Sequence, residues 1–386
     1  MSAWWLVIPV AICVWSAVYQ WLGVWLVVRW LREATDSAAT LEPVTLLRPL
    51  KPGVSDLRGK LEALVRAMRP GDQLVLGAAT GSAEFRECAD LQRHFLDRDI
   101  VVVPCSEGAA VNPKVSKLVQ MEGKCRHERL ILSDSEALID GAWLDAFRSE
   151  WESHGVDALT TGYRFVGATT WPQRLDAVPM LLSLWPGLAL VRQWGRVDFT
   201  LGACTGLRQR DLTEIGGWQA LGDFLAEDRE LGAALSARGR TIRLASIVTT
   251  LESDPLTWRD WWRHQRRVAA TYRACAPAGF AGMLLTHGAT AALVLAAVPV
   301  APALRPWCVG GAVCFVVIRW LGARSLARVL AFPIAALFVS MLVAGVVETI
   351  AWALSWLPGR IWWSARWWRV RGRGKLVEAP QNSPAS

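Results

Sequence analysis

An uncharged apolar run near the start of the chain most constrains what it can fold into. Residues 3–28 carry no charged side chain, and a helix of about 20 such residues spans the hydrocarbon core of a bilayer. Arg29 and Arg32 follow directly, and the cytoplasmic flanks of membrane helices are rich in Lys and Arg. We expect a transmembrane helix over residues 1–30, with its amino terminus outside. A cleaved signal peptide fits less well, because a basic start and a clear small-residue cleavage site are lacking.

Charged residues then continue through the middle of the chain and become rare again. Residues 40–278 suit one soluble domain large enough to bury its own core, and we expect it in the cytoplasm. Residues 279–360 are predicted to be transmembrane or re-entrant, with candidate segments at about 280–302, 306–321 and 329–357. We favour two full crossings, because three would place the basic tail outside. Glu348, in the third segment, is expected to face protein or headgroups.

The formal net charge of +8 does not indicate a nucleic-acid partner. The excess gathers beside the apolar segments, in Arg319, Arg324 and Arg328 and in residues 361–386, where arginines and tryptophans are interleaved. Such clusters are typical of an interfacial anchor on an anionic leaflet, and the polar tail after residue 377 is expected to be disordered. The eight cysteines form no C-x-x-C pair, which favours reduced thiols over a zinc site or a disulfide framework.

Short runs rich in Val, Ile and Leu alternate with helical patterns in the middle section. The predicted strands are 44–47, 73–76, 100–103 and 129–132, and the predicted helices between them are 55–68, 82–96 and 112–126. This alternation predicts an α/β domain with a doubly wound, mostly parallel sheet. Ligands bind such sheets beyond the carboxyl ends of the strands. We therefore look for chemistry in the loops that follow these four strands.

A second apolar run, residues 178–194, is interrupted by Pro179, Pro186 and Gly187. We expect it to be too broken for a spanning helix. A membrane-surface element and a buried core segment are both open.

Two carboxylates separated by one residue, Asp134 and Glu136, follow the fourth predicted strand. Both can face one hard divalent cation, which would bridge to a nucleotide diphosphate. Alternatively, Ser133 or Asp134 caps the next helix.

Two further stretches are candidates for function, and each also has a simpler structural explanation. Asp228, in residues 225–232, could deprotonate an acceptor hydroxyl, or it could belong to an acidic first helical turn. The basic, Trp-containing stretch 261–268 could clamp a diphosphate, or it could be a juxtamembrane anchor.

The order of these features resembles the ceramide glucosyltransferase family, and more closely its bacterial hopanoid-associated branch. The resemblance covers residues 4–377 and includes the stretches 44–53, 112–115, 133–136 and 225–228 and the basic stretch. It implies a GT-A fold (Rossmann-like, with a mostly parallel sheet), a UDP-sugar donor, Mg²⁺ or Mn²⁺, and an inverting single displacement onto a lipid hydroxyl. It also implies a multi-pass protein of the cytoplasmic membrane.

By this resemblance the site residues have the following roles. Asp134 and Glu136 correspond to the metal-binding D-x-D pair, and Asp228 corresponds to the catalytic base. The donor-binding positions are Lys51, Lys114, His264, Gln265, Arg266 and Arg267.

The chain departs from the family pattern in three places. The loop at 77–83 has no acidic residue to seat the uridine, and the first carboxylate after it is Glu84. Glu136 ends the D-x-D pair with a longer side chain. Val268 replaces the expected tryptophan after Arg267.

Two other functions remain open at this point. A processive polysaccharide synthase shares these motifs but typically needs more membrane helices for its channel. A catalytically silent relative that binds lipid or a partner enzyme would fit the altered positions.

Overall fold

The computed structural model describes residues 4–33, 42–333 and 337–379. The chain divides into two compact units. The sheet unit comprises Leu31–Val166 and Trp194–Asp254, and the helical unit comprises Met1–Trp30, Gly167–Gln193 and Pro255–Ser386. The chain therefore enters the helical unit three times, and two of its segments there, 167–193 and 255–278, fall inside the domain predicted over 40–278.

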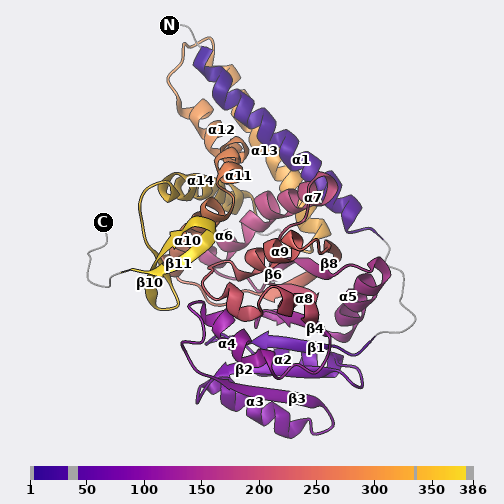
Figure 1. Cartoon of the computed structure of the whole chain (residues 1–386). Helices are drawn as coiled ribbons and strands as arrows, with labels where there is room; N and C mark the ends of the chain where they lie inside the picture. The colour runs from indigo at the N-terminus through magenta and orange to yellow at the C-terminus, as the bar shows by residue number, and fades with distance from the viewer. Residues whose placement is uncertain (1–3, 34–41, 334–336, 380–386) are drawn as a thin grey trace. The chain divides into compact units, whose positions relative to one another are not determined.

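The sheet unit is built on one eight-stranded sheet with the order β3-β2-β1-β4-β7-β6-β8-β5. Strands β3, β2, β1 and β4 are parallel neighbours (Figure 1). Strand β7 runs antiparallel to β4 and β6, and β6 pairs with β8 in parallel. All four predicted strands and the three predicted helices between them are confirmed. The elements are β1 (Thr45–Pro49), α2 (Leu57–Ala67), β2 (Gln73–Ala79), α3 (Ala83–His94), β3 (Asp99–Cys105), α4 (Pro113–Glu122), β4 (Arg129–Ser133), β5 (Ala137–Leu138), α5 (Gly141–His154), β6 (Ala158–Val166), β7 (Cys204–Arg208), α8 (Gln209–Glu214), η3 (Trp218–Leu221), α9 (Glu227–Ala237) and β8 (Ile242–Glu252).

Both faces of this sheet are covered by helices, which explains why neighbouring residues in its strands are apolar. Leu46 and Leu74 belong to the core formed with α2, α3 and α5. Their chain neighbours Leu47 and Val75 belong to the opposite core, formed with α4, α8 and α9. Because successive side chains of a strand alternate between faces, two adjacent apolar residues supply both cores.

The helical unit contains the apolar helices and a small sheet. Its elements are η1 (Trp4–Leu6), α1 (Val7–Trp30), α6 (Trp171–Pro179), η2 (Met180–Leu184), α7 (Trp185–Trp194), α10 (Trp258–Cys275), α11 (Pro277–Gly282), η4 (Met283–Thr286), α12 (Gly288–Ala297), α13 (Arg305–Val329), α14 (Leu337–Ser355), β9 (Ile361–Trp363), β10 (Arg366–Arg371), η5 (Gly372–Gly374) and β11 (Lys375–Glu378).

Among the described residues, four helices are long and apolar enough to cross a membrane: Trp4–Trp30, Trp171–Trp194, Arg305–Val329 and Leu337–Ser355. A fifth candidate is a helix pair bent by 43° between Thr286 and Gly288. The first candidate agrees with the predicted amino-terminal helix. The number of true crossings after residue 279 stays a prediction.

The prolines of the second apolar run do not interrupt its helix, contrary to our expectation. Residues Trp171–Trp194 form one helix of 24 residues, which is long and apolar enough to cross a membrane. A π-helical turn at Met180–Leu184 follows Pro179, and Trp185 N donates to Met180 O. Such a turn accommodates locally altered backbone hydrogen bonds without ending the helix. Whether this helix lies on the membrane surface stays a prediction.

Polar side chains inside the helical unit contact one another. Arg319 is buried in the middle of α13, and its Nη1 donates to Ser16 Oγ of α1 at 3.1 Å. Placing Arg319 in an interfacial charge cluster was therefore wrong, because α13 continues for ten residues beyond it. Glu348 faces protein, as expected, since Ser183 Oγ donates to its Oε1 at 3.1 Å.

The Trp- and Arg-rich segment forms a three-stranded antiparallel sheet, β9-β10-β11. Trp362 and Trp367 face each other across β9 and β10 with ring centroids 5.2 Å apart. The predicted disordered tail lies, from residue 380 onward, outside the described residues.

Candidate active site

Residues that follow β1 and β4 meet at one edge of the sheet, because these strands are parallel neighbours with Leu47 opposite Leu132. Lys51 comes two residues after β1, and Asp134 comes directly after β4. Asp134 N donates to Ala203 O at 3.2 Å, and Ala137 N donates to Asp134 O at 3.1 Å. These bonds form a turn that presents residues 134–136 beyond the strand.

Lys114 connects two acidic side chains at this edge. It stands in the first turn of α4, whose N-cap Asn112 accepts from Lys114 N at 2.9 Å through Oδ1. Lys114 Nζ lies 2.7 Å from Asp134 Oδ1 and 2.8 Å from Glu227 Oε1. Asn112 Nδ2 donates to the other oxygen of Glu227 at 3.1 Å. The cap of α4 thus holds both the lysine and one of its carboxylate partners.

Asp228 reaches the same place from the start of α9. Thr200 Oγ1 donates to Asp228 O at 2.7 Å. A Cβ built on Gly202 would lie 3.2 Å from Asp228 Oδ2, 3.4 Å from Asp134 Oδ2 and 3.5 Å from Lys114 Nζ. The four side chains of Lys114, Asp134, Glu227 and Asp228 are called the Gly202 cluster below.

A second glycine allows α9 to approach this loop closely. A Cβ on Gly232 would lie 2.2 Å from Phe199 Cα, a contact that no larger residue tolerates without backbone movement. The close packing keeps the first turn of α9 beside residues 199–202. The position of Asp228 therefore depends on Gly232, one turn further along the helix.

Lys51 binds the second acid of the predicted D-x-D pair. Its ammonium forms ion pairs with Glu136 and, at 2.6 Å, with Asp254 Oδ2 just after β8. Ser135 Oγ also donates to Glu136 Oε2 at 2.7 Å. The adjacent acids Asp134 and Glu136 thus each have their own lysine partner.

The pKa values in the Gly202 cluster are displaced from their ordinary range. Burial raises the pKa of Asp228 to about 7, and the neighbouring charge of Glu227 acts in the same direction. Burial also raises the pKa of Asp134. Burial alone would lower the pKa of Lys114, but the adjacent carboxylates raise it well above its usual value. A carboxyl with a pKa near neutrality is suited to accept a proton at physiological pH.

The Lys51 pair behaves differently. Burial opposes ionisation of Glu136, but the nearby Lys51 overcomes this and lowers the pKa of the carboxyl. Glu136 is therefore the more strongly ionised acid of the predicted metal pair.

The first carboxylate after the loop at 77–83 points back toward the loop that follows β1. Glu84 Oε1 accepts from Gly53 N at 3.0 Å. Gly53 has φ +75°, a left-handed backbone conformation that favours glycine. Glu84 thus lies beside the first of the loops at the carboxyl edge, although it belongs to α3.

The remaining predicted donor-binding residues lie on α10, in the helical unit. His264 Nδ1 and Gln265 Nε2 both contact Asp176 Oδ1 of α6, at 2.7 and 3.0 Å. Arg267 lies over the ring of Trp363, with 5.9 Å from its Cζ to the ring centroid. A Cβ on Gly359 would lie 3.1 Å from Arg266 Nη2.

Reasoning from the sequence missed three partners of the predicted residues. Glu227 and Asp254 bind the two lysines, and Asp176 binds two side chains of α10. Glu227 adjoins Asp228 in the sequence, so its place beside a predicted site residue could have indicated its role. The other two come close to their partners only through the fold.

No group of three or more His, Cys, Asp or Glu side chains arranged to hold a metal ion is found in residues 4–33, 42–333 and 337–379. A divalent cation on a nucleotide needs only one or two carboxylates, because phosphates and water complete its shell. Two carboxylates, Asp134 and Glu136, would suit such a donor set, and the ammonium of Lys114 pairs with Asp134 at 2.7 Å.

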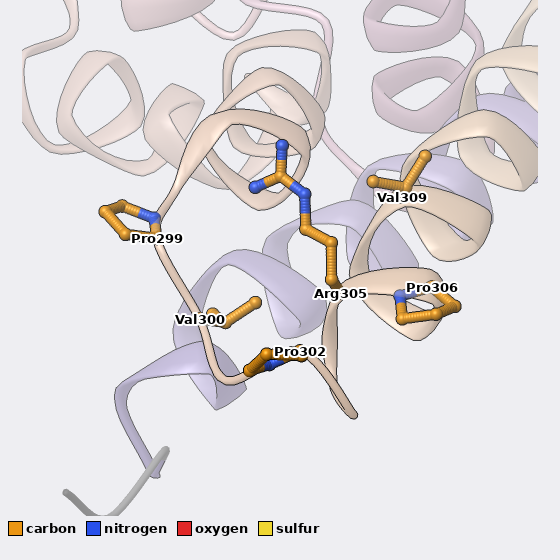
Figure 2. A pocket seen from close by; sticks show the side chains of 6 residues that line it. All are labelled: Pro299, Val300, Pro302, Arg305, Pro306 and Val309. Atoms are coloured by element: carbon orange, nitrogen blue, oxygen red, sulfur yellow. The ribbon is translucent and has the colours of Figure 1, made fainter.

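A pocket of about 670 Å³ lies in the helical unit, at the loop between α12 and α13 (Figure 2). It is lined mainly by apolar side chains, and Arg305 Nη1 donates to Val298 O at 2.9 Å. It contains none of the predicted site residues, so it does not change the assignment. Its lining residues are Pro299, Val300, Pro302, Arg305, Pro306 and Val309.

A family profile, glycosyl transferase family 21, matches residues 8–376 of the chain. The chain belongs to glycosyl transferase family 21. This confirms the family implied by the sequence motifs and the enzyme class, glycosyltransferase.

Individual relatives support the class and the fold. A probable glycosyltransferase of Bacillus subtilis, YdaM, is 32% identical over 77 residues, which are 20% of this chain and 18% of that protein. The structure of the mannosyltransferase PcManGT from Pyrobaculum calidifontis, in complex with GDP-mannose and Mn²⁺, is similar with a TM-score of 0.52 at 16% identity, covering 90% of this chain and 99% of that one. This similarity confirms the predicted GT-A fold.

Proposed function

We propose that this family 21 protein is a membrane-bound inverting glycosyltransferase. It moves a hexose or N-acetylhexosamine from a UDP-sugar to a lipid hydroxyl at the cytoplasmic leaflet. The observation that carries the proposal is the convergence of Asp134, Asp228 and Lys114 on Gly202. This convergence supports the proposal, because an acid for the metal, a proton acceptor and a cation would then surround one glycine, whose missing side chain allows close approach to the backbone.

The transfer is a single displacement. The acceptor hydroxyl oxygen forms a bond to the anomeric carbon while the bond from that carbon to the UDP oxygen breaks. Asp228 takes the hydroxyl proton, for which its pKa of about 7 is suited. Because the attack is from the face opposite the leaving group, the anomeric configuration inverts.

Asp134 and Glu136 would hold Mg²⁺ or Mn²⁺. When bound there, the ion neutralises charge on the departing diphosphate. Lys51 and Lys114 stand beside these acids and would exchange a carboxylate partner for a phosphate oxygen. The structure of the distant mannosyltransferase with GDP-mannose and Mn²⁺ is consistent with this chemistry.

The α10 residues His264, Gln265, Arg266 and Arg267 are proposed to contact the diphosphate. Contacts with Asp176 hold the side chains of His264 and Gln265 in place. This role is an extension of the family resemblance.

The acceptor is proposed to be a membrane lipid such as a hopanoid, a ceramide or a similar lipid, with the hopanoid-associated branch favoured. Support comes from the four apolar helices of the described residues and from Arg29 and Arg32 after the first one, which favour a cytoplasmic sheet unit.

The test uses the purified full chain with radiolabelled UDP-glucose or UDP-N-acetylglucosamine, Mn²⁺ or Mg²⁺, and a bacterial lipid extract. Labelled organic-soluble product that depends on the metal supports the proposal. Chelation with EDTA should abolish it and excess Mn²⁺ restore it. A labelled insoluble polymer would instead indicate a processive synthase, and the absence of product with every donor would favour a silent relative.

A further inference from the structure

Arg48, in β1, is a fully buried arginine directly beneath the turn that carries Asp134 and Glu136. Its Nε donates to Ser133 Oγ at 3.2 Å, and its Nη2 donates to Ala137 O at 3.1 Å. Ser133 and Ala137 are the residues that bracket 134–136. One rigid guanidinium therefore holds both ends of the acidic turn.

The environment of Arg48 is unusual for a structural arginine. Its Nη1 is buried and has no hydrogen-bond partner within the described part of the chain. A buried charge without a directly paired charge is costly. Arg148 shows the ordinary arrangement in the same unit, because it forms two bonds with Asp72, at 2.7 and 3.0 Å.

Burial lowers the pKa of Arg48 to about 10, whereas the nearby thiol of Cys204 and the carboxylates of Glu136 and Asp134 act in the opposite direction. The side chain therefore stays charged at neutral pH. Both acids favour the charged guanidinium, although its hydrogen bonds go to Ser133 and Ala137.

We propose that Arg48 is a positioning residue for the cation site: it fixes the 134–136 turn so that Asp134 and Glu136 can bind one divalent ion together. This inference rests on the function proposed above. Partners that orient metal ligands typically change metal affinity by about 10- to 100-fold when they are removed.

The test is a titration of the purified full chain with Mn²⁺, in which free Mn²⁺ is followed by electron paramagnetic resonance, first with the metal alone and then with UDP. Arg48→Lys keeps the charge but cannot bond both ends of the turn, so we expect affinity to fall about tenfold or more. Ser133→Ala removes the acceptor of Arg48 Nε with a small side-chain change and should also weaken binding. Arg148→Lys is the matched control and should stay within about twofold.

Thermal unfolding of each variant separates folding from metal binding. Weaker Mn²⁺ binding in Ser133→Ala, with Arg148→Lys unchanged, supports the proposal even if Arg48→Lys does not fold. Unchanged affinity in both Ser133→Ala and a folded Arg48→Lys overturns it. Asp134→Asn tests the proposed function separately: if binding survives this change, or the parent protein does not bind Mn²⁺, the metal assignment fails and the role of Arg48 fails with it.

Discussion

Lys114 and Asp134 form an ion pair of 2.7 Å at the carboxyl edge of the sheet. The pair joins the start of α4 to the end of β4, and its lysine also binds Glu227. The ammonium thus balances part of an acidic cluster that would otherwise repel itself.

Replacing Lys114 should destabilise the sheet unit. Lys114→Met leaves its carboxylate partners without their cation, and an unsatisfied charged group costs about 2 kcal/mol or more. Lys117, on the same helix, is the control, because burial lowers its pKa and thus disfavours its charge. Thermal unfolding should show a lower midpoint for Lys114→Met and little change for Lys117→Met. Equal midpoints would contradict a neutralising role for Lys114.

The activity should rise with pH through neutrality. Asp228 accepts a proton only when it is ionised, and its pKa is about 7. The value of kcat/KM should therefore increase about tenfold per pH unit below 7 and level off above it. Glu227→Gln removes a neighbouring negative charge, so this limb should move to lower pH. A profile that is flat between pH 5 and 8 in the parent protein would argue against Asp228 as the base.

Asp228→Asn should reduce kcat by about 10²- to 10⁴-fold, because a side-chain amide cannot take the proton from the hydroxyl group of the lipid. Asp223→Asn, five residues earlier and exposed, is the matched control and should leave kcat unchanged. Both variants are measured with the lipid-extract assay. Comparable rates in the two variants would assign the base elsewhere.

Adding one methyl group at Gly202 should impair catalysis while the protein stays folded. Its Cβ would lie 3.2 Å from Asp228 Oδ2, so the carboxylate must move by a few tenths of an ångström. Misplacement by 1 Å can cost about 10²-fold in rate, so we expect about a tenfold loss for Gly202→Ala. Gly123→Ala, which meets no atom within 4 Å, should be neutral. A fully active, folded Gly202→Ala would show that the cluster tolerates displacement.

Asp176 should affect binding of the UDP-sugar by holding His264 and Gln265 of α10. Asp176→Ala releases His264 and Gln265, so the KM for the UDP-sugar should rise about tenfold if these residues bind the diphosphate. In a double-mutant cycle, Asp176→Ala and His264→Ala should be non-additive. Additive effects would mean that Asp176 does not work by orienting His264.

The local pattern predicted the sheet unit well because its strands are buried on both faces. Adjacent residues are apolar in both 44–47 and 73–76, and a parallel sheet that is covered on both faces buries both members of such a pair. Because β1 and β4 are parallel neighbours, the loops that follow them bring Lys51 and Asp134 to the same edge of the sheet. The prolines at 179 and 186 misled us, because a π-helical turn can absorb an irregularity that residue types alone do not reveal.

The sequence by itself determined the apolar helices, the alternation of strands and helices, and the acidic motifs, because each is encoded by residues close together in the chain. Only the tertiary structure decided which charges meet. The pairing of Lys114 with Glu227 and of Lys51 with Asp254, the burial that raises the pKa of Asp228, and the position of Arg48 beneath Asp134 and Glu136 all depend on strands and loops distant in sequence. Ion pairing and desolvation depend on distance and burial in three dimensions, and neither quantity is local in the chain.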